Sequence, residues 1–141
     1  MEAVFDDSLV TGNEMIDTQH KELINRINKL LLICANETSA KREAVETLDY
    51  LAEYTDFHFN AEEKLQEEIG YPGIEEHKEK HEELRRVVKE LHEMLEEQEG
   101  PTDEFVEQVN KNVTAWLYNH IRGFDRSVAE YRFMRDNAGL I

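Results

Sequence analysis

The sequence contains very few of the residues that interrupt or cross-link a chain. Only two prolines and six glycines occur among 141 residues, which favours long helices joined by short turns. The single cysteine, Cys34, excludes an internal disulfide. The longest purely apolar run, LLLICA at residues 30–35, is far too short to span a bilayer. The acidic start MEAVFDDSL lacks the basic and apolar stretches of a signal peptide, so we expect a cytoplasmic protein.

Basic residues are also scarce. Lys and Arg together number 16 against 32 Asp and Glu, which gives a formal net charge of −16. Such a chain repels phosphate backbones and anionic lipid, and this argues against nucleic-acid and membrane partners. High charge can also indicate disorder, but 40% of the residues are hydrophobic and they recur in a regular pattern. Residues 1–141 are therefore expected to form one domain.

Turn signals divide the chain into four helices. GYPG at residues 70–73 and GPT at residues 100–102 each end one helix and precede the next, and Ser39 is a candidate N-cap. Helices are expected at about 18–36, 39–69, 74–98 and 103–122, with an arm at 1–16 and a C-terminal segment at 123–141. Each helix has an apolar face with residues four and three apart. The sequence thus predicts an all-α fold, an up-down-up-down antiparallel four-helix bundle with an extended N-terminal arm and a short C-terminal helix.

Polar residues interrupt these apolar faces in all four helices. Five histidines and one glutamate fall in register with the apolar residues: His20, His58, Glu62, His77, His81 and His120. A buried imidazole or carboxylate is costly without a partner, so these side chains must satisfy one another or share a cation. Asp125 lies five residues beyond His120, about 140° around an ideal helix. We expect Gly123 to break the helix and turn Asp125 inward.

These five imidazoles and two carboxylates predict a metal site. One such histidine alone would indicate a hydrogen-bonded core residue, and we interpret His92 as a flanking residue and Cys34 as core packing. Structural zinc usually takes thiolates, and no CxxC is present; calcium and magnesium prefer oxygen ligands. Seven nitrogen and oxygen donors exceed the needs of one ion but suit two ions bridged by carboxylates. A pair of irons is the economical interpretation.

The ordered motifs resemble those of hemerythrins. A lone histidine in the first helix is followed by HxxxE, HxxxH and HxxxxD, and the stretches GNEMIDTQHKEL, HFNAEEKL and WLYNHI are also similar. The resemblance, over residues 5–130, implies that His77, His81 and His120 hold one iron and that His20 and His58 hold the other. Glu62 and Asp125 would bridge both irons, with an oxo or hydroxo bridge between them. Phe5 and Gln66 depart from the pattern, where Trp and an apolar residue are expected.

The resemblance also implies a function in dioxygen binding. Dioxygen would bind at the two-histidine iron, Leu117 and Ile121 match pocket positions of the family, and Ile24 and Trp116 are neighbours by spacing. We expect a carrier, store or scavenger that binds dioxygen reversibly, as a monomer or weak homo-oligomer. A di-iron peroxidase, a nitric oxide or oxygen reductase with a redox partner protein, a sensor, and an iron or zinc store remain alternatives. The ExxH pairs of ferritin-type oxidases are absent.

Overall fold

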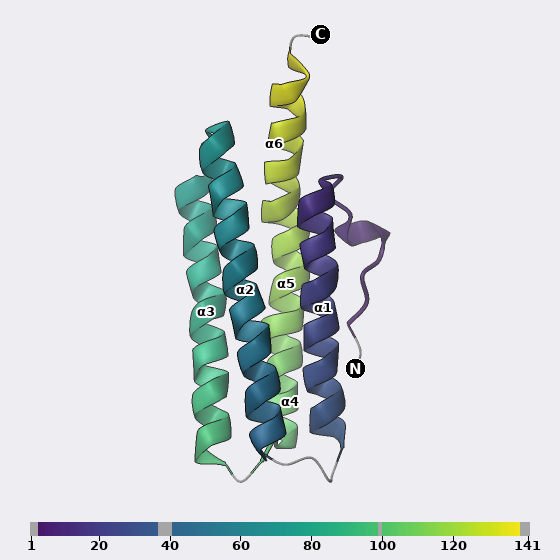
Figure 1. The fold of residues 1–141 in the computed structure, drawn as a ribbon, viewed down its shortest axis with the longest axis vertical. Coiled ribbons are helices and arrows are strands. Elements are labelled where there is room, and N and C mark those ends of the chain that lie inside the picture. The colour runs from purple at the N-terminus through teal and green to yellow at the C-terminus, as the bar shows by residue number, and fades with distance from the viewer. Residues whose placement is uncertain (1–2, 37–40, 99, 139–141) are drawn as a thin grey trace.

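The computed structural model describes residues 3–36, 41–98 and 100–138, and every regular element in them is helical. Three long helices, α1 (Glu14–Ala35), α2 (Lys41–Ile69) and α3 (Ile74–Glu97), run in alternating directions (Figure 1). The fourth helical column is built from α4 (Asp103–Gln108), α5 (Ala115–His120) and α6 (Arg126–Asp136). It completes the up-down-up-down antiparallel bundle that the sequence predicts, and α6 extends beyond the other helices (Figure 1).

Local capping chemistry sets the helix ends. Asn13 caps α1 through a hydrogen bond from the Ile16 amide, so this helix begins four residues earlier than the predicted start at residue 18. Gly70 ends α2 with a φ of +67°, a left-handed conformation that favours glycine. Thr102 caps α4 by accepting a hydrogen bond from the Phe105 amide. The predicted cap Ser39 lies outside the described residues.

The fourth column differs from the prediction at Gly123. We expected the helix to end at residue 122 and break there, but the chain remains helical through α6. Two π-helical segments, η2 (Val109–Thr114) and η3 (Ile121–Asp125), widen the column instead. In η3 the Arg126 amide donates to the Ile121 carbonyl, five residues back. A π turn closes over five residues, so it brings residues i and i+5 to the same side of the helix.

Two apolar clusters fill the bundle interior. The larger contains Leu23, Leu51, Leu84 and Val113, among others, and the smaller contains Ile16, Leu65, Ile69 and Val128. On α1 and α2, the residues of the smaller cluster lie on one side of the polar positions 20 and 58–62. Those of the larger cluster lie on the other side, except Phe59, which lies among the polar positions. The polar side chains therefore form a layer between two apolar layers.

The N-terminal arm packs along the bundle. It contains a short 3-10 turn, η1 (Asp7–Leu9), and places Leu9 in full burial. The amide and carbonyl of Ala3 bond the Asn28 side chain on α1, each at 2.7 Å. Arg126 on α6 donates to the carbonyl oxygens of Ser8 and Val10 at 2.6 and 3.2 Å. The arm thereby ties the first helix to the last.

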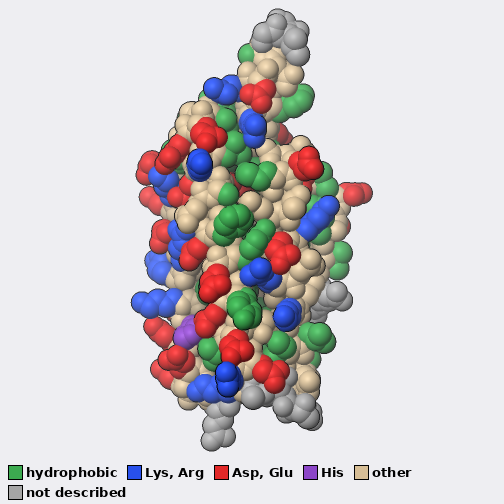
Figure 2. Space-filling model, in the orientation of Figure 1, with side chains coloured by type: hydrophobic (Ala, Val, Ile, Leu, Met, Phe, Trp, Pro, Cys, Tyr) green, Lys and Arg blue, Asp and Glu red, His purple; other side chains and the backbone are tan. Residues whose placement is uncertain are grey.

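The surface is strongly charged. Acidic and basic side chains are interspersed over the face in Figure 2, with the acidic ones more numerous. Within the described residues, none of the helices combines the length and the apolar character that a membrane crossing requires.

Candidate metal centre

The structure brings all seven predicted site residues together in the polar layer. They come from five helical segments: His20 from α1, His58 and Glu62 from α2, His77 and His81 from α3, His120 from α5, and Asp125 from η3. Each is buried, with no more than 4% of its surface exposed. The π turn of η3 directs Asp125 into the layer. Asp125 therefore points inward as predicted, but through a π turn and not through a helix break at Gly123. The seven residues form two groups that share both carboxylates.

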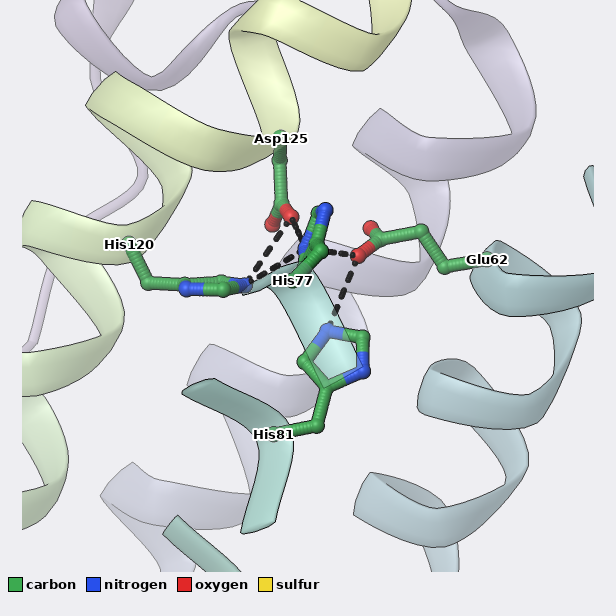
Figure 3. A group of neighbouring side chains, drawn as sticks. All are labelled: Glu62, His77, His81, His120 and Asp125. Atoms are coloured by element: carbon green, nitrogen blue, oxygen red, sulfur yellow. Dashed lines mark hydrogen bonds and ion pairs between the residues drawn. The ribbon is translucent and has the colours of Figure 1, made fainter. Parts of the chain in front are cut away.

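The first group contains three imidazoles and both carboxylates: Glu62, His77, His81, His120 and Asp125 (Figure 3). His77 Nε2 lies 2.9 Å from Glu62 Oε1, 3.0 Å from Asp125 Oδ1 and 2.9 Å from His120 Nε2. His81 Nε2 lies 3.2 Å from Glu62 Oε1, and His120 Nε2 lies 3.2 Å from Asp125 Oδ1. Three ring nitrogens and one oxygen of each carboxylate therefore converge on one small volume.

The second group contains His20 and His58 with the same two carboxylates. His20 Nε2 lies 2.7 Å from Asp125 Oδ2 and 3.9 Å from Glu62 Oε2, and His58 Nε2 lies 3.2 Å from Glu62 Oε2. Oε1 and Oδ1 thus face the three-histidine group, and Oε2 and Oδ2 face the two-histidine group. Each carboxylate presents one oxygen to each group.

Several of these buried atoms have no hydrogen-bond partner. They are both ring nitrogens of His20, Nδ1 of His120, Oε2 of Glu62 and both carboxylate oxygens of Asp125. Short separations between donor atoms do not require hydrogen bonds here, because two ligand atoms at neighbouring positions around one ion lie about 3 Å apart. The closely spaced atoms and the unsatisfied lone pairs fit two cations better than they fit a hydrogen-bonded core.

Comparison with known proteins identifies the family of the chain. Residues 11–131 match the model of the hemerythrin HHE cation binding domain. The chain belongs to the hemerythrin family. A bacteriohemerythrin of Stenotrophomonas maltophilia is 38% identical over 90% of this chain and 79% of its own length. One of Pseudomonas paraeruginosa is 36% identical over 86% of this chain and 76% of its own length. The crystal structure of wild-type hemerythrin superimposes with a TM-score of 0.76 at 26% identity, over 90% of this chain and 95% of that one.

Electrostatics keep the shared carboxylates of this hemerythrin-family site ionised. Burial and the nearby Asp125 raise the pKa of Glu62, but His58 and His77 outweigh them, and the pKa falls below its usual range. Burial also opposes ionisation of Asp125, yet His120, His20 and His77 hold its pKa well below the usual value. Both carboxylates are therefore anionic and require positive charge beside them.

The histidines respond in different ways to the same surroundings. Burial lowers the pKa of His77, but the close carboxylates of Asp125 and Glu62 outweigh burial and raise the pKa to about 9. Burial likewise opposes protonation of His58, and the Glu62 carboxylate raises its pKa nevertheless. The pKa of His120 is lowered, because burial prevails there. In the metal-free state, the proton on His77 thus supplies part of the positive charge that the carboxylates require.

The sequence did not predict the polar side chains that contact the Nδ1 atoms of the imidazoles, on the side of each ring away from the shared carboxylates. The Nδ1 atoms of three rings each face a polar side chain: His58 faces Gln19 Oε1 at 2.7 Å, His77 faces Gln66 Nε2 at 3.0 Å, and His81 faces Glu63 Oε2 at 2.8 Å. Gln19 and Glu63 are sequence neighbours of His20 and Glu62, and nothing in the spacing indicates that they reach a different residue. Such partners orient the ring of a metal ligand.

Aromatic rings hold two of the histidines as well. Phe59 stacks on His81, with ring centres 3.8 Å apart and planes 5° apart. His120 lies between Trp116 and Phe124, at 4.4 and 5.2 Å, with nearly parallel planes. These aromatic residues lie four positions before and after His120 on one continuous helical column. His120, whose Nδ1 lacks a hydrogen bond, is therefore oriented by ring packing.

The predicted dioxygen-pocket residues lie in and around the core. Ile24, Leu117 and Ile121 are buried in the larger apolar cluster. Trp116 is half-buried, stacks on His120 and lines a surface hollow with Glu83 and Lys111. The indole thus contacts the three-histidine group, whereas the pocket was predicted beside the two-histidine iron. The role of these four residues in a dioxygen pocket stays a prediction.

Two residues that sequence reasoning set aside lie outside the site. His92 is partly exposed, and its Nε2 lies 3.3 Å from Asp49 Oδ1 on the neighbouring helix. Cys34 is partly buried against the larger apolar cluster. Both positions agree with the interpretation of flanking and packing residues.

Proposed function

We propose that this hemerythrin-family chain holds two iron ions and binds dioxygen reversibly, as a carrier, store or scavenger. One observation supports the proposal above the others: each of the two buried carboxylates presents one oxygen to a three-histidine group and the other oxygen to a two-histidine group. A carboxylate that binds two ions through different oxygens requires this arrangement. When bound, an iron pair supplies the two electrons that dioxygen accepts on binding.

The two groups would give the two ions different numbers of protein donors. His77, His81 and His120 would hold one ion, and His20 and His58 would hold the other, with Glu62 and Asp125 shared. The second ion would then have one protein donor fewer, which would leave a coordination position for dioxygen. Ile24, Leu117 and Ile121 would provide an apolar wall that excludes water, because their side chains are almost fully buried.

Iron loading and optical spectroscopy test this proposal. The protein, loaded with ferrous iron under anaerobic conditions, should contain two iron atoms per chain. Air should produce a new visible absorption band, and removal of dioxygen should abolish it. One iron atom per chain after complete loading would contradict the two-ion assignment, and a band that persists after deoxygenation would contradict reversible binding.

A redox enzyme with a partner protein is the second candidate. The half-buried Trp116 stacks on His120 and lines a surface hollow, so an aromatic contact joins the site to the outside. Sustained consumption of hydrogen peroxide or nitric oxide in the presence of an electron donor would favour this role over dioxygen carriage.

A further inference from the structure

Gln66 is a fully buried polar residue beside the proposed metal centre. It lies on α2, four residues after Glu62, and none of its surface is exposed. Its amide reaches across to α3, where Nε2 lies 3.0 Å from Nδ1 of His77. The amide oxygen Oε1 is buried and has no hydrogen-bond partner. Because this oxygen has no donor, the hydrogen-bond requirement of His77 decides which end of the amide faces the ring.

The chemistry of His77 selects between the two amide orientations. Nε2 of His77 points into the three-histidine group, where it lies within 3.0 Å of Glu62, Asp125 and His120 atoms. A ring that binds a metal through Nε2 must leave that nitrogen unprotonated, so its hydrogen lies on Nδ1. Nδ1–H is a donor and requires an acceptor. Rotation of the Gln66 amide by half a turn places Oε1 there as the acceptor and moves the amide nitrogen to the buried position that the oxygen occupied.

We propose that Gln66 is a positioning residue for the metal centre, which accepts a hydrogen bond from Nδ1–H of His77 and so fixes the tautomer and orientation of that ring. The inference depends on the proposed function, because it assigns the Nε2 lone pair of His77 to a metal ion. Gln66 does not itself bind the metal.

Two neighbouring histidines have the same support. Gln19 Oε1 faces Nδ1 of His58 at 2.7 Å, and Glu63 Oε2 faces Nδ1 of His81 at 2.8 Å. In both cases an oxygen stands behind the ring while Nε2 points to the shared carboxylates. With its oxygen turned toward His77, Gln66 completes a set in which three of the five imidazoles are held by an acceptor.

Gln66 also occupies a position where the resemblance to hemerythrins led us to expect an apolar side chain. An apolar residue cannot accept a hydrogen bond, and Nδ1 of His77 would then face no acceptor from α2. The proposed support of His77 therefore depends on a polar residue at position 66.

Two substitutions separate the hydrogen bond from packing. Gln66→Met keeps the length of the side chain and removes the acceptor, whereas Gln66→Glu keeps an acceptor and adds charge. Thr55→Val serves as the control, since Thr55 is another buried polar residue of α2 whose hydroxyl donates to the Leu51 carbonyl and does not face a site residue. The full-length metal-free variants are titrated with zinc against a competing chelator, because zinc is diamagnetic and has no redox chemistry.

Gln66→Met should weaken zinc binding by about tenfold or more, the usual loss when the partner of a ligand is removed. Thr55→Val should retain the affinity of the parent, and Gln66→Glu should retain or increase it. In the zinc-loaded parent, nitrogen-15 NMR should show a slowly exchanging proton on Nδ1 of His77. The signal should exchange rapidly in Gln66→Met and persist in Gln66→Glu, a difference that packing alone does not produce.

Unchanged zinc affinity together with an unchanged Nδ1–H signal in Gln66→Met would overturn the inference. Parent-like zinc affinity in Gln66→Met together with weaker affinity in Gln66→Glu would overturn it as well, since this result would assign the role of Gln66 to packing. A parent protein that binds no metal would instead contradict the proposed function, and it would remove the basis for a positioning role.

Discussion

At the scale of single residues, the site consists of side chains that could bind metal and of neighbouring side chains that orient them. The carboxylates of Glu62 and Asp125 are divided between two sets of imidazoles. Behind the imidazoles stand Gln19, Glu63 and the Phe59 ring, among others. Loss of a donor and loss of a wall residue should therefore have different consequences, because the first changes how much metal binds and the second changes what reaches the metal.

Leu117 and His77 allow these consequences to be separated. Leu117 is 3% exposed and precedes His120 by one helical turn. We expect Leu117→Ala to admit water beside the centre and to quicken autoxidation of the oxygenated protein, while two irons per chain are retained. His77→Ala should lower the iron content instead, because it deletes a donor of the three-histidine group. Iron analysis and the decay of the optical spectrum in air measure the two effects.

Leu95→Ala is the matched control for the new cavity. Leu95 is fully buried on the same helix as His81, fourteen residues or about 21 Å farther along. Both leucine variants should lose stability, by about 2–5 kcal/mol. Only Leu117→Ala should autoxidise faster. Equal autoxidation of Leu117→Ala and the parent would remove Leu117 from the proposed dioxygen pocket.

At the scale of helices, most of the architecture follows from sequence pattern and one feature does not. The spacing of apolar residues on faces that include His20 and His58 predicts four helices and a shared interior layer, because helical geometry is regular. The π turn at Ile121–Asp125 is different: an inserted residue shifts the register without any distinctive residue type. Gly123 suggested a break, and the structure replaces that break with a wider turn. The supports Gln19, Glu63 and Gln66 were also not predicted, since they depend on contacts between helices.

A π turn and a glycine break at position 123 predict opposite effects of replacing Gly123 by alanine. A Cβ added at Gly123 would have no heavy atom within 4 Å, and the residue is helical without a positive φ. Gly123→Ala should therefore preserve the metal content and raise stability by about 0.5–1 kcal/mol, measured by urea unfolding. Gly70→Ala is the comparison, because its φ of +67° should make alanine destabilising by about 1 kcal/mol or more. Loss of metal in Gly123→Ala would show that the turn needs glycine.

At the scale of the whole molecule, the proposed centre joins every long helix of the bundle. The donors come from α1, α2, α3 and the fourth column, and the polar layer lies between two apolar clusters. Without metal the layer retains two anionic carboxylates and several buried atoms that lack partners. Bound ions would remove these costs and cross-link the four helices at one level. Folding and metal binding should therefore be strongly coupled.

Metal removal should lower the melting temperature of the protein. A ligand that binds only the native state, at a hundred times its dissociation constant, stabilises that state by about 2.7 kcal/mol. For a chain of this size, that corresponds to roughly 8 °C or more in melting temperature. Thermal unfolding of the metal-free, zinc-loaded and iron-loaded forms at one pH measures the shift. Zinc should stabilise the fold as iron does, because the cross-link needs charge and coordination but no redox chemistry, whereas only the iron form should respond to dioxygen. Equal melting temperatures for all three forms would mean that the seven side chains do not couple metal binding to the fold.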